Sequence, residues 1–265
     1  MTFTLTKHQA LGNDFLVTFD RIGDGASLAR TLCDRRRGIG ADGLLLASRL
    51  DDRDDDWTMV LFNADGSRAE MSGNGIRCFA QAVARRLGMT QGSLRVHTDA
   101  GLRTLDITPG AHAAEIWATV EMGAAAPLDP PVNWGALGCD PGRPVAHLSM
   151  GNPHSVVLTD DVRAVDLEAL GRLVPDVNLE IVEPGPEPGA ITMRVHERGA
   201  GITEACGTGA SAAAHAAVSW GIVAGTTVTV HQPGGDAEVL VGETLVLRGP
   251  SAYVATIMID GDISA

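Results

Sequence analysis

The sequence predicts an α+β protein of two pseudo-symmetric domains, each a mostly antiparallel sheet or barrel wrapped around a central helix. The first observation is an internal repeat: residues 70–75 (EMSGNG) recur in changed form at 204–209 (EACGTG), an offset of 134 (204 minus 70). The second is that expected strands greatly outnumber expected helices. The third is that each half holds one long, nearly all-apolar helix, and such helices are buried on most sides.

The repeat extends in both directions from this turn. Matching positions pair Ala80 and Ala82 with Ala214 and Ala216, residues 96–97 with 230–231, Gly101 with Gly235, and His8, Gly12, Asn13 and Val17 with His147, Gly151, Asn152 and Val156. We therefore expect an N-terminal domain of residues 1–118, to which the final strand within 252–265 returns, and a C-terminal domain of residues 119–251.

Alternating apolar and polar residues predict the individual strands. In the first half these cover residues 3–8, 15–19, 44–47, 57–63, 94–98, 103–107 and 116–121. Ser27 is expected to cap a short helix through Cys33, and an Ala-rich helix should cover 76–87 before Gly88. The acidic run 51–56 is expected to be an exposed turn. The domain crossing should lie just before residues 122–131, which are rich in Ala, Gly and Pro.

The second half repeats this order. Strands are expected at 156–158, near 181, and at 191–196, 227–231, 238–241 and 253–259, and helices at 167–173 and 209–220.

Composition excludes several classes of function. The chain has 265 residues and a formal net charge of −13, which argues against nucleic acid or an anionic membrane as partner. No apolar stretch is long enough for a membrane span, and the N-terminus does not resemble a signal peptide, so we expect a cytoplasmic protein with reduced thiols. The four cysteines lack zinc spacing, so no metal is expected. Lys7 is the only lysine, which argues against pyridoxal phosphate, and no cofactor is expected.

Each copy of the repeat carries a Gly-x-Gly turn into a helix, directly after Ser72 or Cys206. The first N–H groups of a helix have no internal partner and lie at its positive end, so two such turns predict two anion cradles. A thiol at a helix N-terminus has a lowered pKa, so Cys206 is expected to act as a thiolate base. The alternative is that Cys206 is a small buried hydrophobe.

Several motifs, in order across nearly the whole chain, resemble those of diaminopimelate epimerases. They are residues 12–15 (GNDF), 38–43 (GIGADG), 62–67 (FNADGS), 73–78 (GNGIRC), 151–154 (GNPH), 177–178 (VN), 197–199 (ERG) and 204–209 (EACGTG). The resemblance implies a cofactor-independent two-base epimerase that converts LL-diaminopimelate to the meso form, on the pathway to lysine and peptidoglycan. It also implies two similar halves with a small amino-acid substrate between them, and a homodimer.

The resemblance also implies residue roles. Cys206 and the group at position 72 transfer the protons, and the amides after them hold the reacting α-carboxylate. Arg198 suits a carboxylate, and His154 and Glu197 tune the pKa of the catalytic groups. For His154 the alternative is a purely structural, hydrogen-bonded histidine. The implied substrate contacts are Asn13, Asn63, Gly73, Asn74, Asn152, Asn178, Glu197, Arg198, Gly207 and Thr208.

The chain departs from the family at two positions. The family has its second catalytic cysteine where this chain has Ser72, and a hydroxyl is a far weaker base than a thiol. Ser72 is then natural in a working enzyme, an introduced inactivating change, or a sign of another substrate. Gly43 stands where many relatives have Gln, which removes one substrate contact.

Three other functions compete with this interpretation. They are another racemase on the same scaffold, an isomerase with an acid in place of the cysteine, and an inactive amino-acid-binding protein. Retention of Cys206 disfavours the isomerase, and Ser72 alone supports the binding protein.

Overall fold

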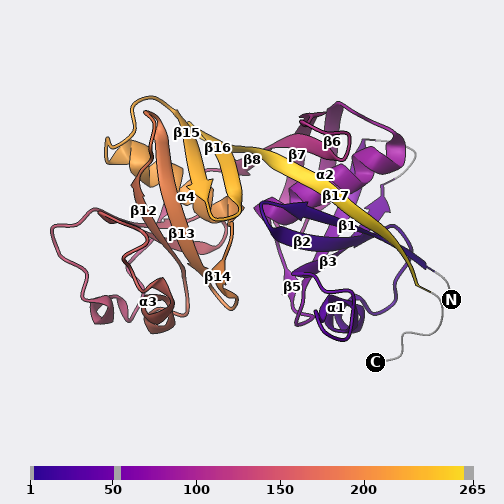
Figure 1. Cartoon of the computed structure of the whole chain (residues 1–265), viewed down its shortest axis with the longest axis horizontal. Helices are drawn as coiled ribbons and strands as arrows, with labels where there is room; N and C mark the ends of the chain where they lie inside the picture. Colours follow the sequence, from indigo (N-terminus) through magenta and orange to yellow (C-terminus); the bar gives the residue numbers. More distant parts are fainter. Residues whose placement is uncertain (1–2, 51–54, 260–265) are drawn as a thin grey trace. The chain divides into compact units, whose positions relative to one another are not determined.

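The computed structural model describes residues 3–50 and 55–259, and it divides into two compact units (Figure 1). Unit 1 is Met1–Val120 with Gly249–Ala265, and unit 2 is Glu121–Arg248. Most of the acidic run, for which an exposed turn is expected, lies outside the described residues.

Unit 1 is a closed ring of strands. In pairing order they are β17, β1, β2, β3, β4, β6, β7 and β8, after which β8 pairs with β17 again. The pairs β2–β3 and β4–β6 are parallel, and the short β5 extends β4. The strands are β1 (Phe3–Ala10), β2 (Asn13–Thr18), β3 (Gly43–Arg49), β4 (Asp56–Asn63), β5 (Arg68–Ala69), β6 (Gly92–Thr98), β7 (Gly101–Pro109), β8 (Glu115–Gly123) and β17 (Leu245–Ile259).

Unit 2 repeats this pairing pattern. The order is β9, β10, β11, β12, β13, β15, β16 and the first part of β17, and the parallel pairs β11–β12 and β13–β15 occupy the same places. The repeated topology confirms the predicted fold class. The strands are β9 (Ala126–Pro127), β10 (Val145–Ser149), β11 (Pro153–Leu158), β12 (Asn178–Pro184), β13 (Ala190–Glu197), β14 (Gly201–Thr203), β15 (Thr227–Gln232) and β16 (Gly235–Val241).

One buried helix fills each unit: α2 (Gly73–Leu87) packs on β1 to β4, and α4 (Gly207–Ser219) packs on β10 to β13, β15 and β16. Figure 1 shows strands in front of each helix. The predicted starts at 76 and 209 are wrong, because each helix begins directly after the residue that caps it. Smaller helices are α1 (Gly25–Cys33), α3 (Leu167–Leu173) and the 3₁₀ turn η1 (Trp134–Leu137).

The predicted cap of α1 is also wrong. Asp24 caps this helix, because its Oδ1 accepts the N–H of Ser27 at 3.0 Å, and the carboxylate lies at the positive helix end. Within the described residues, no helix is long and apolar enough to cross a membrane.

His8 on β1 is fully buried against Tyr253 of β17, with 5.7 Å between ring centroids. Its repeat counterpart His147 bonds Ser155, but neither ring nitrogen of His8 has a hydrogen-bond partner among the described residues. Burial lowers the pKa of His8 from 6.5 to about 4; the charge of Arg85 adds to this shift and Gln81 opposes it.

We expect unit 1 to lose stability in mild acid. A histidine with a lowered folded pKa contributes stability that is present above its unfolded pKa of 6.5 and is lost as the pH falls toward 4. At pH 5 this loss is about 2 kcal/mol in the free energy of unfolding. His8→Leu should remove this part of the pH dependence in urea unfolding at pH 7 and 5, whereas His112→Gln, at an exposed histidine, should keep it. An unchanged slope in His8→Leu would contradict the assignment.

Candidate active site

Ser72 and Cys206 occupy equivalent backbone positions at the N-termini of α2 and α4. Their φ and ψ angles are −141° and 124° for Ser72, and −133° and 118° for Cys206. Ser72 Oγ accepts the N–H of Gly75 at 3.0 Å, and Cys206 Sγ accepts the N–H of Gly209 at 3.3 Å. In both units, the side chain predicted to transfer a proton is therefore the N-cap of a buried helix.

The N-cap residue of each helix is followed by the residues whose backbone N–H groups form the helix N-terminus. Gly73 and Asn74 follow Ser72, and Gly207 and Thr208 follow Cys206. Because the N–H groups at the start of a helix lack internal acceptors and lie at the positive end of the dipole, each end suits a carboxylate.

Cys206 is nearly fully buried, and both its sulfur and its backbone N–H form hydrogen bonds. Its Sγ lies 3.4 Å from Thr208 Oγ1, and its backbone N–H donates to Gln232 Oε1 at 2.9 Å. Burial raises the pKa of the Cys206 thiol well above 9, and the charges of Glu197 and Glu180 add to this, although the Thr208 and Gly209 bonds oppose it. The lowered pKa predicted from the helix end is therefore wrong, because desolvation and two carboxylates outweigh the helix end.

A hydrogen-bonded chain joins Thr208 to a buried acid. Asn152 Nδ2 donates to Thr208 Oγ1 at 3.4 Å, and Asn152 Oδ1 lies 3.0 Å from His154 Nε2. His154 Nδ1 lies 2.7 Å from Glu180 Oε1, and both of these side chains are fully buried. Four residues predicted for the site, Cys206, Thr208, Asn152 and His154, thus form one connected group in unit 2.

The remaining predicted residues of unit 2 lie along the ends of β12 and β13. Thr203 donates its hydroxyl to Glu197 Oε1 at 2.6 Å, and Glu197 is close enough to Cys206 to raise its pKa. Asn178 donates to Pro153 O at 3.0 Å and accepts the N–H of Arg198 at 2.9 Å, so it joins two backbone segments. The Arg198 side chain is exposed, and no ion pair of its guanidinium is found within residues 3–50 and 55–259.

In unit 1 a chain of side chains also reaches the helix end. Arg77 Nη2 donates to Asn74 Oδ1 at 2.8 Å, Asn74 Nδ2 donates to Asn13 Oδ1 at 3.3 Å, and Asn13 Nδ2 donates to Asp42 Oδ2 at 2.6 Å. Arg35 pairs with Asp42 at 2.7 Å. This chain fixes both amides between a buried cation and a carboxylate, and it brings Asn13 and Asn74 together.

Asn63 lies apart from this chain. It is exposed, its Nδ2 donates to Ser67 Oγ at 2.9 Å, and it pairs across the sheet with Gly43. A Cβ at position 43 would lie 2.8 Å from the carbonyl oxygen of Phe62 and 3.0 Å from Phe15. A longer side chain at position 43 therefore requires the neighbouring backbone to shift.

The two units differ in the groups that surround their helix ends. In the sheet register, the Phe15–Gly43 pair of unit 1 corresponds to the His154–Asn178 pair of unit 2. In the same way, the Val17–Leu45 pair corresponds to the Val156–Glu180 pair. Unit 1 thus has Phe15 and Leu45 where unit 2 has the His154–Glu180 pair. The titratable pair belongs to the unit with the thiol.

Sequence reasoning missed Glu180, Gln232, Arg77 and Asp42, and it gave Arg35 no role. For Glu180 a signal was present, because it is a lone acid in the apolar run 179–182 of a predicted strand. Arg35 bonds Asp14 and Asp42, and only the fold brings these residues together.

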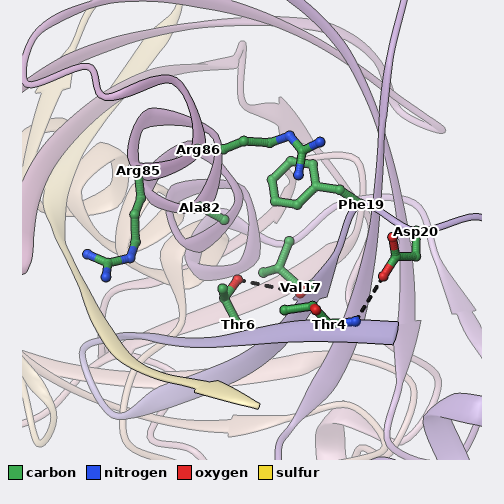
Figure 2. A pocket seen from close by; sticks show the side chains of 8 residues that line it. All are labelled: Thr4, Thr6, Val17, Phe19, Asp20, Ala82, Arg85 and Arg86. Carbon is green, nitrogen blue, oxygen red and sulfur yellow. Dashed lines mark hydrogen bonds between the residues drawn. The ribbon is translucent and has the colours of Figure 1, made fainter. Parts of the chain in front are cut away.

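A cavity of about 360 Å³ in unit 1 contains none of the predicted site residues (Figure 2). It lies at the C-terminal end of α2, where the positive charges of Arg85 and Arg86 offset the helix dipole. Its lining residues are Thr4, Thr6, Val17, Phe19, Asp20, Ala82, Arg85 and Arg86.

Comparisons with known proteins agree with one another. The family model described as diaminopimelate epimerase matches residues 5–127 and 146–253. The chain is similar to diaminopimelate epimerase 1 of Nostoc sp. (35% identity over 97% of this chain and 99% of the relative) and to the diaminopimelate epimerase of Microcystis aeruginosa (38%, 96% and 98%).

Solved structures with the same fold share little sequence. They include a predicted epimerase from Pseudomonas aeruginosa, with a TM-score of 0.77 and 15% identity over 98% of this chain and all (100%) of that chain. A hydroxyproline epimerase from Agrobacterium vitis has a TM-score of 0.68 and 15% identity over 97% of this chain and 91% of that chain.

Gly209→Ala should destabilise unit 2. A Cβ at position 209 would lie 2.6 Å from Glu180 Oε1 and 3.2 Å from Cys206 Sγ, and both groups are confined by packing. We expect a loss of about 1–3 kcal/mol in the free energy of urea unfolding. In the control Gly135→Ala the new methyl meets nothing within 4 Å, so the change should be within about 0.5 kcal/mol. Equal effects of the two variants would show that position 209 is not crowded as described.

Proposed function

The chain belongs to the diaminopimelate epimerase family, and from this premise we propose that it converts LL-2,6-diaminopimelate to the meso isomer by cofactor-independent proton transfer at one α-carbon. The observation that carries the proposal is the pair of equivalent helix N-caps, each with a protic side chain at the N-terminus of a buried helix. Inversion needs one proton to leave a face of the carbon and another to arrive at the opposite face.

We assign the removal of the α-proton to Cys206. In this step the Cα–H bond breaks, an S–H bond forms on the thiolate, and the electron pair moves onto the α-carboxylate. The N–H groups of Gly73, Asn74, Gly207 and Thr208 stabilise that developing charge. The raised pKa of Cys206 makes its thiolate a stronger base toward a weak carbon acid, and the thiol has to lose its proton to water before each turnover.

Ser72 is assigned the opposite proton transfer. A hydroxyl remains protonated near neutral pH, so Ser72 serves as a donor to the carbanion. Water then protonates the Ser72 alkoxide, and the hydroxide that is left takes the proton that Cys206 gained. In the reverse direction the same oxygen is a poor base. The support for this division is the capping geometry shared with Cys206, together with the apolar residues Phe15 and Leu45 in unit 1, which offer no base.

The substrate contacts follow from charge and hydrogen-bonding groups. Arg198, with its exposed guanidinium, is proposed to bind the distal carboxylate. Glu197, by its charge, is proposed to tune the Cys206 thiol, and His154 to tune it through Asn152 and Thr208. Asn13, Asn63, Asn152 and Asn178 are proposed to contact the ammonium and carboxylate groups. A substrate with two amino-acid ends would use all of these.

Ser72→Cys tests the assignment of both positions. With LL-diaminopimelate in buffered water, we expect the rate of inversion to rise about 100-fold, because a thiol replaces a poor acid–base group. Cys206→Ala should abolish inversion in either background. Chiral chromatography of the product measures both rates. An unchanged rate in Ser72→Cys would contradict the role of position 72, and inversion that survives Cys206→Ala would overturn the proposed function.

We further propose a cytoplasmic homodimer. Four free cysteines fit a reducing compartment, and Val254 and Met258 on β17 are 51% and 70% exposed, which suits a second copy. Sedimentation equilibrium at micromolar concentration should give twice the mass of 27.6 kDa, and Met258→Glu should shift the population toward monomer. A monomeric parent protein would contradict this.

A further inference from the structure

Glu180 is a buried acid to which the reaction assigns no role. We propose that Glu180 is a positioning residue, which acts through His154 and Asn152 to direct the hydroxyl hydrogen of Thr208 toward the sulfur of Cys206. The inference deepens the proposed function, because it rests on Cys206 being the group that takes the proton.

The first step concerns the tautomer of His154. Its Nε2 faces the carbonyl oxygen of Asn152 at 3.0 Å, and a carbonyl only accepts, so Nε2 must carry a hydrogen. Its Nδ1 lies 2.7 Å from Glu180 Oε1. As a protonated acid, Glu180 Oε1 donates to Nδ1, which leaves the single ring hydrogen on Nε2. An ionised Glu180 would instead accept from Nδ1–H, and Nε2 would then be a donor only in the imidazolium. Glu180 thus determines that Nε2, on the opposite side of the ring, donates its hydrogen to Asn152 Oδ1.

The second step concerns how the hydrogen-bond direction set at His154 determines which group donates to the sulfur of Cys206. With Oδ1 held by His154, Asn152 presents its Nδ2 to Thr208 Oγ1. The Thr208 oxygen then accepts from Asn152, and its own hydrogen is free to donate to Cys206 Sγ at 3.4 Å. Together with the Gly209 N–H, this gives the thiolate two donors. If Nδ1 carried the only ring hydrogen, Asn152 would turn over and Thr208 would donate to Asn152 instead.

The energetic cost of burying the Glu180 carboxyl group supports a functional role for this residue. Its side chain is fully buried, and its Oε2 has no hydrogen-bond partner among the described residues. Burial raises the pKa of Glu180, and His154 opposes the shift. The register-equivalent residue in unit 1 is Leu45, which is also fully buried, so the barrel accepts an apolar side chain here. An acid that the fold does not require is retained beside the thiol.

Two variants separate an effect of hydrogen-bond direction at His154 from an effect of the Glu180 charge. Both Glu180→Gln and Glu180→Leu remove the carboxylate, but only Gln can donate an amide hydrogen to His154 Nδ1. We expect ¹⁵N NMR of the His154 ring to show a protonated Nε2 in the parent protein and in Glu180→Gln, and a loss of that tautomer in Glu180→Leu. This readout needs no catalytic activity, so it stays informative if diaminopimelate is not the substrate. Thermal unfolding of each variant checks that it is folded.

The kinetic test is the rate of deuterium uptake at Cα of diaminopimelate in deuterated water. Glu180→Leu should lower the rate about tenfold, as expected for loss of one hydrogen bond to a charged group, and Glu180→Gln should restore most of it. Thr208→Val removes the last donor, so adding Glu180→Leu to it should cause no further loss. Equal rates for Gln and Leu at position 180 would reduce Glu180 to a charge effect and overturn the proposal. So would additive losses in the double variant, or an unchanged His154 tautomer in Glu180→Leu.

Discussion

Each unit encloses one largely buried helix within strands, and the proposed position of the chemistry follows from this burial. The residues of α4 that face the strands are mostly alanines, so the strands can approach the helix closely and hold it in one place. A helix held in this way has a fixed N-terminus, and its first N–H groups need partners there. Ser72 and Cys206 supply one acceptor each at these helix ends.

The two units share a backbone and differ in chemistry. Both helix ends have an extended N-cap residue and a glycine three positions later. Around the thiol, unit 2 has a histidine, two carboxylates and a threonine, all within hydrogen-bonding or electrostatic range of one another. Around the hydroxyl, unit 1 has amides fixed between Arg77 and Asp42. The asymmetry therefore extends beyond the change of sulfur to oxygen.

The sequence was sufficient for the fold class, because the repeat and the apolar helices are local patterns. The family resemblance named Cys206, Thr208, Asn152 and His154, and the structure connects these four residues by hydrogen bonds. The sequence did not reveal that the pKa of Cys206 is raised, because this shift depends on burial and on the nearby charge of Glu180. Both result from pairing between strands that are distant in the sequence. The Asp14–Arg35–Asp42 ion pairs are of the same kind. Asp24 was overlooked as a cap because Ser27 also has the right chemistry for one.

The proposed mechanism requires that Cys206 exchanges protons efficiently and that Ser72 does so poorly. The most direct measurement is the ratio of deuterium exchange to inversion at Cα, for the unmodified protein with LL- and with meso-diaminopimelate in deuterated water. We expect exchange to exceed inversion with the isomer whose α-proton faces Cys206, and exchange with the other isomer to be slow. Equal exchange and inversion from both isomers would mean that the two positions are equivalent bases, which would contradict the proposed division of roles between Cys206 and Ser72.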